Sequence, residues 1–134
     1  YLLGIRSAGE VATHPLVGGL FENFVIAEAL KARLNRGLEP DLHFYRNSSG
    51  SLEVDLLMED HGRLYPVEIK SSSTYDASMS RHLTAFSKLC PEAGKGRVVY
   101  SGETIPNIAA HFADVPAWCI YDGERGQSRP SPRP

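Results

Sequence analysis

The chain has 134 residues, of which 42% are apolar and 22% are charged, and its formal net charge is −2. This length suits one domain with a sizeable core and is too short for two. The mean hydropathy of −0.25 and the lack of a long apolar run predict a soluble domain without a membrane span. A pI near 6.2 lacks the overall basic signature of dedicated nucleic-acid-binding domains.

The ends of the sequence predict the domain limits. It begins with Tyr1 and shows no secretion signal, so we expect a segment of a longer protein. Residues 1–19 mix apolar residues with Gly, Ser and Pro and suit a lead-in segment. We predict one domain over 1–122 and a disordered, proline-rich tail at 123–134.

Apolar residues recur at helical spacing between Leu20 and Leu34. Basic Lys31 and Arg33 fall in the last turns, where the helix dipole favours positive charge, and Gly37 follows as a stop signal. We predict a helix over 20–34.

Two hairpins are predicted next. Residues 42–59 contain two strand-like stretches separated by Asn47–Gly50, which is a turn sequence. A second turn at Asp60–Gly62 precedes the strand-like stretch 63–73. Three consecutive antiparallel strands follow from this pattern.

The last third of the chain predicts one more helix and one or two strands. Pro91 and Gly94 end a predicted helix over 78–89, whose apolar stripe consists of Met79, Leu83, Phe86 and Leu89. Residues 96–102 form a β-branched strand, and residues 117–123 a further strand near the sheet edge.

Glu68 and Lys70 lie two positions apart in an otherwise apolar strand, so both side chains face the same side of the sheet. If His61 and Gly62 form a two-residue turn, Asp60 pairs with Arg63 and Leu57 with Pro66. Asp55 then lies opposite Glu68, and two like charges in that position need a cation between them. Lys70 or a divalent metal ion would supply it.

Carboxylate oxygens favour a hard cation, so we expect Mg²⁺ or Mn²⁺ rather than zinc at Asp55 and Glu68. Glu22 supplies a third ligand if the helix over 20–34 crosses the sheet. A metal ion, its carboxylate ligands and a lysine are the groups that phosphodiester hydrolysis requires.

The segments "GGLFENFV", "EVDLL" and "VEIK" resemble the motifs of the PD-(D/E)xK nuclease superfamily. More narrowly, "HPLVGGLFENFVIAEALK", "FYRNSSGSLEVDLLME" and "LYPVEIKSSSTY" resemble the domain that follows the ATPase core of many bacterial and archaeal AAA-type ATPases. The resemblance covers about Leu3 to Asp122. Val54 stands where the superfamily pattern has proline before its aspartate.

This resemblance implies an α/β, restriction-endonuclease-like αβββαβ core in which a mixed central sheet is flanked by helices. It implies a metal-dependent nuclease acting on DNA, with RNA as the less favoured substrate. Asp55, Glu68, Lys70 and Glu22 are the implied catalytic residues, and the three carboxylates are the implied metal ligands. An ATPase domain in the same full-length chain is the implied partner, and a homo-oligomer would suit cutting of two strands. Cys90 and Cys119 lack metal or disulfide spacing, which favours a cytoplasmic setting.

Other interpretations remain open at this point. A strand Glu-x-Lys is commonly an exposed salt-bridged face, and Glu22 near a helix N-terminus is favourable through the dipole alone. A catalytically inactive nuclease-fold module that binds nucleic acid or a protein and regulates the ATPase is the second function. The hydroxyl run 71–74 suits either phosphate contacts or a polar strand exit. A nucleic-acid groove or a solvated surface would accommodate Tyr45, Arg46, Arg81, His82 and Lys88.

Overall fold

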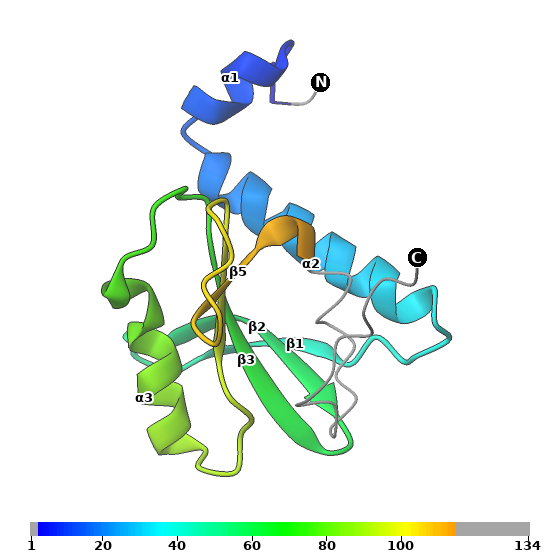
Figure 1. Cartoon of the computed structure of the whole chain (residues 1–134), viewed down its shortest axis with the longest axis vertical. Helices are drawn as coiled ribbons and strands as arrows, with labels where there is room; N and C mark the ends of the chain where they lie inside the picture. Colours follow the sequence, from blue (N-terminus) through cyan, green and yellow to red (C-terminus); the bar gives the residue numbers. More distant parts are fainter. Residues whose placement is uncertain (1–2, 115–134) are drawn as a thin grey trace, which may run out of the picture.

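A computed structural model describes residues 3–114. The sheet has five strands in the order β1-β2-β3-β4-β5 (Figure 1). β1 to β3 are antiparallel neighbours, whereas β4 runs parallel to β3 and β5 runs parallel to β4, so the sheet is mixed. The strands are β1 (Leu42–Arg46), β2 (Glu53–Asp60), β3 (Arg63–Lys70), β4 (Arg97–Tyr100) and β5 (Ala109–His111).

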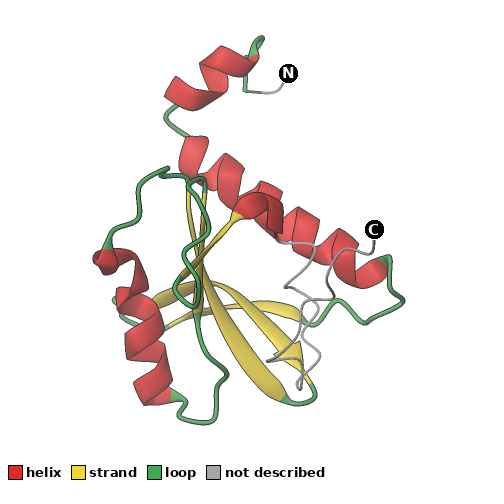
Figure 2. Cartoon of the chain, viewed as in Figure 1, coloured by secondary structure: helices red, strands yellow, loops and turns green. Residues whose placement is uncertain are grey.

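Helices cover the two faces of this sheet (Figure 2). The long helix α2 (Val17–Leu34) buries Val25 and Ala29 in the main core cluster of residues from β2 to β5. On the opposite face, α3 (Arg81–Leu89) buries Leu83 and Phe86. Each face of the sheet therefore has its own core, and the predicted α/β architecture with a mixed sheet flanked by helices is confirmed.

Three short helices complete the described chain: α1 (Ala8–Thr13), η1 (Ala77–Ser80) and η2 (Phe112–Asp114). The first lies beyond the sheet, next to the start of α2 (Figure 1). None of the helices within residues 3–114 has both the length and the apolar character needed to cross a bilayer.

Several predicted boundaries need correction. α2 begins at Val17 rather than Leu20, so the lead-in segment 1–19 contains a short helix and the first residues of a long one. The helix predicted over 78–89 is divided into η1 and α3, and Leu89 of its stripe is 58% exposed. β5 was not predicted, because Ala-Ala-His carries no β-branched residue. The strand predicted at 117–123 and the tail at 123–134 lie outside the described residues.

The turn between β2 and β3 has the predicted register. His61 and Gly62 both have positive φ, of 48° and 74°, which is the requirement of a type I′ hairpin turn. Asp60 accordingly pairs with Arg63 and Leu57 with Pro66. The ladder continues to Leu56 and Val67, one step short of Asp55 and Glu68.

Candidate functional site

A β-bulge in β2 places Asp55. His43 pairs with Leu57 and Tyr45 with Val54, so Asp55 and Leu56 together lie opposite the single residue Phe44. Such a bulge redirects a side chain and interrupts strand pairing. Asp55 therefore projects toward the end of β3 instead of continuing the ladder.

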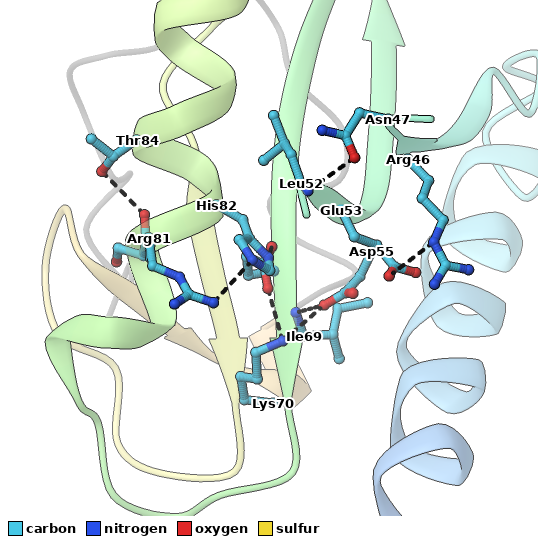
Figure 3. Close-up of polar contacts among 12 residues, drawn as sticks. Arg46, Asn47, Leu52, Glu53, Asp55, Ile69, Lys70, Arg81, His82 and Thr84 are labelled. Atoms are coloured by element: carbon cyan, nitrogen blue, oxygen red, sulfur yellow. Dashed lines mark hydrogen bonds and ion pairs between the residues drawn. The ribbon is translucent and has the colours of Figure 1, made fainter. Parts of the chain in front are cut away.

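The carboxylate of Asp55 interacts with the end of β3. Asp55 Oδ2 accepts a hydrogen bond of 2.8 Å from the backbone N–H of Ile69 and lies 3.3 Å from Lys70 Nζ (Figure 3). The predicted direct pair of Asp55 with Glu68 is not part of the hydrogen-bonded ladder between β2 and β3, which ends at Leu56 and Val67, and Asp55 Oδ2 instead accepts from the Ile69 backbone. The predicted proximity of Asp55 to Lys70 is confirmed.

Glu68 is the most deeply buried charged residue of the group, with 1% of its surface exposed. Its Oε2 lies 2.8 Å from Lys70 Nζ, and its Oε1 lies 3.3 Å from Nδ1 of His82 on α3. Oε1 nevertheless has no hydrogen-bond partner of good geometry. A buried carboxylate oxygen in this condition is costly, and a bound ion or a catalytic role is among the explanations for it.

Lys70 is the cation that holds the two carboxylates together. Its ammonium contacts both Asp55 and Glu68, while its side chain stays 39% exposed. Burial alone would lower the pKa of Lys70, but the bonds with Glu68 and Asp55 outweigh burial and raise it. Lys70 is therefore positively charged at neutral pH and within reach of solvent.

Burial is the main cause that raises the pKa of Glu68, and the charge of Asp55 adds to it, while Lys70 and His82 act in the opposite direction. Burial also raises the pKa of Glu22, with a second contribution from Asp55. Glu22 thus belongs electrostatically to this site. Because α2 begins at Val17, Glu22 lies beyond the first turn, where the dipole effect is weak.

The donor set of three carboxylates suits a hard divalent cation, and the unbonded oxygen of Glu68 fits a further ligand. As they lie, however, no three His, Cys, Asp or Glu side chains within residues 3–114 are grouped closely enough to hold a metal ion. In the structure it is the ammonium of Lys70 that lies between the carboxylates of Asp55 and Glu68.

Residues proposed for a nucleic-acid groove have different surroundings. Tyr45 packs edge-on against Phe86 with ring centroids 5.4 Å apart, so it is a partly buried residue at the margin of the core. Arg46 lies 3.7 Å from Glu53 and remains largely exposed. In the hydroxyl run, Ser72 Oγ bonds within its own turn, to the backbone N–H and C=O of Thr74. This arrangement favours the interpretation of the run as a polar strand exit.

Sequence reasoning missed His82 as a member of the site. Its helical position was visible, but no spacing rule connects a residue on α3 to one on β3. His82 comes close to Glu68 because the burial of Leu83 and Phe86 docks α3 on the sheet.

In a comparison with known families, the family described as Domain of unknown function (DUF4143) matches residues 17–120. No curated protein and no solved structure matches the chain significantly. The matched range begins with α2 and contains Glu22, Asp55, Glu68, Lys70 and His82.

Proposed function

Because this chain belongs to the family described as Domain of unknown function (DUF4143), whose description assigns no chemistry, its function has to be argued from the site, and we propose that it is a divalent-metal-dependent nuclease domain. The observation that carries the proposal is the contact of Lys70 Nζ with two carboxylates, one of which is almost fully buried and has an unbonded oxygen. A purely structural core has no evident need for such a costly buried group.

Asp55, Glu68 and Glu22 would hold the metal ion, Mg²⁺ or Mn²⁺. When bound, this ion would neutralise a phosphate group and acidify a water molecule. Lys70 would donate a hydrogen bond to the charge that develops on the phosphate oxygens. Its raised pKa keeps this donor protonated at neutral pH.

DNA is the substrate we propose. Arg46 and Arg81 lie on opposite sides of the Asp55 and Lys70 side chains (Figure 3), and both arginines are exposed. Arginine side chains bind phosphate groups well, so these two suit the phosphates on either side of a scissile bond. The fold order of α2, β1, β2, β3, α3 and β4 agrees with a PD-(D/E)xK core, which would act beside an AAA-type ATPase domain of the same protein, alone or as a homo-oligomer.

A second candidate is a catalytically inactive module that binds nucleic acid or a partner protein. Lys70 already offsets part of the negative charge of Asp55 and Glu68, and no preformed metal group exists among the described residues. A domain of this kind would regulate the neighbouring ATPase through binding alone.

Cleavage of labelled single- and double-stranded DNA with Mg²⁺, Mn²⁺ or Ca²⁺ tests the proposal. We expect cleavage with the first two ions, its loss with chelator, and binding of Ca²⁺ without cleavage, because its looser coordination activates water poorly. Lys70→Ala should retain metal binding and lose activity about 100-fold or more, whereas Glu68→Gln should lose both. Lys88→Ala and Glu59→Gln are the controls. Absence of metal binding in the wild type would favour the inactive module.

A further inference from the structure

His82 reaches the site from α3. Its neighbour Leu83 is buried against the sheet, and this packing turns His82 toward Glu68, with Nδ1 3.3 Å from Oε1. The side chain of His82 is 28% exposed, whereas that of Glu68 is 1% exposed. The imidazole is therefore the group that lies between the buried carboxylate and the exposed surface of α3.

The contact with Arg81 determines which nitrogen of the ring carries the proton. Arg81 Nη2 lies 3.4 Å from His82 Nε2 (Figure 3). A guanidinium group has donors only, so Nε2 must act as the acceptor. In a neutral imidazole the single proton then resides on Nδ1, which faces Glu68.

We propose that His82 is a positioning residue that holds Glu68 through Nδ1–H, with its tautomer set by Arg81. Lys70 binds Oε2, so a small rotation of the ring that aligns Nδ1–H with Oε1 would fix both oxygens of the carboxylate. Glu68 would then keep one orientation in the absence of metal. The inference rests on the proposed function only in giving Glu68 a role as a ligand, because the contacts of His82 with Glu68 and Arg81 do not involve a metal ion.

The tautomer of His82 in the metal-free protein can be measured by long-range ¹H–¹⁵N NMR. We expect protonation at Nδ1 in the wild type and a shift toward the Nε2–H form in Arg81→Ala and in Glu68→Gln. The control is Lys88→Ala, an exposed cation on the same helix. A wild-type ring protonated at Nε2 alone, or at both nitrogens, overturns the proposal.

Two amide substitutions test which ring nitrogen matters for metal binding. In Asn the side-chain nitrogen takes the place of Nδ1, whereas in Gln it lies nearer the place of Nε2. Partners of metal ligands typically contribute 10- to 100-fold in affinity, so His82→Ala and His82→Gln should bind manganese chloride about 10- to 100-fold more weakly in calorimetry. His82→Asn should stay within a few-fold of the wild type.

The two proposals fail in different experiments. If the wild type binds no Mn²⁺, the nuclease proposal fails while the NMR result still decides the role of His82. If the wild type binds Mn²⁺ and His82→Asn loses as much affinity as His82→Ala, the positioning role of His82 is wrong although the metal site exists. Circular dichroism of each variant verifies that it is folded.

Discussion

Asp55 has a structural as well as a chemical task. Its Oδ2 accepts the backbone N–H of Ile69, a residue that is only 5% exposed. At the point where the β2–β3 ladder ends, this side chain replaces the strand partner that the backbone lacks. Removal of the carboxylate therefore affects the sheet even when no metal is bound.

We predict different stabilities for two substitutions at Asp55. Asp55→Ala leaves the Ile69 N–H without its acceptor and should lower the free energy of unfolding by about 1–3 kcal/mol. Asp55→Asn keeps an acceptor oxygen and should lose clearly less. Urea denaturation of the metal-free protein measures both values. Equal losses would mean that the charge contact with Lys70, and not the bond to Ile69, stabilises this end of the sheet.

Arg33 at the end of α2 is a buried cation, 3% exposed, although its position in the last turn predicts an exposed side chain interacting with the dipole. Its Nε donates to the carbonyl of Glu39 at 2.8 Å and its Nη2 to that of Glu59 at 3.2 Å. Asp41 lies 3.5 Å from the same group. The residue connects α2, the loop after it and the end of β2.

Arg33→Met should lower the free energy of unfolding by about 2–3 kcal/mol, because bonds from a charged donor are lost and two carbonyls lose a partner. Arg36→Ala, an exposed arginine three residues later, should change stability by less than about 0.5 kcal/mol. Thermal and urea unfolding of both variants test this. A small effect of Arg33→Met would show that water replaces the guanidinium group without cost.

The segment that leads into α3 depends on Asp76, whose side chain accepts from the backbone N–H of Ser78 at 2.8 Å. Hydrogen bonding with the Ser78 side chain, and next to it this bond from the Ser78 backbone N–H, lower the pKa of Asp76. A lowered folded-state pKa gives stability that is present above the unfolded pKa, about 3.9, and is lost as the pH falls through the folded value.

Asp76→Ala should therefore melt below the wild type at about pH 6, and the difference should shrink toward about pH 3. Asp76→Asn, which keeps an acceptor and does not titrate, is the control for the pH dependence. Its melting temperature relative to Asp76→Ala should stay constant over the same range. A pH-independent difference between wild type and Asp76→Ala would contradict the capping role.

At the scale of the whole molecule, the loops that follow β3 and β4 lie side by side next to the site, because the two strands are parallel and end at the same edge of the sheet. The loops after them are joined by bonds of Ser101 to the carbonyls of Ser71 and Ser72. A Cβ on Gly102 would lie 2.3 Å from the carbonyl oxygen of Ser73, so only glycine allows this distance.

Gly102→Ala should cost about 1–3 kcal/mol, the usual range for overpacking, and should weaken metal binding if the loops support Glu68 and Lys70. Gly19→Ala is the control, because nothing lies within 4 Å of its added Cβ and alanine favours a helix. Calorimetry of unfolding compares them. A Gly102→Ala variant as stable as the wild type would mean that the loops separate freely.

The sequence by itself determined the local features. Helical periodicity predicted α2, period-two alternation put Glu68 and Lys70 on one face, and the turn at His61–Gly62 fixed the register from Asp60 to Leu56. These are short-range consequences of backbone geometry, so nearby residues suffice to predict them. Asp55, Lys70 and Glu68 were consequently predicted as neighbours before any tertiary information.

Only the tertiary structure decided the rest. The bulge that turns Asp55 toward Ile69 depends on how β1 pairs with β2. The burial of Arg33 depends on the loop that closes over it. The contact of His82 with Glu68 depends on the docking of α3. Each joins residues from different elements. Because such contacts are set by packing of the whole core, and not by spacing along the chain, no local pattern in the sequence encodes them.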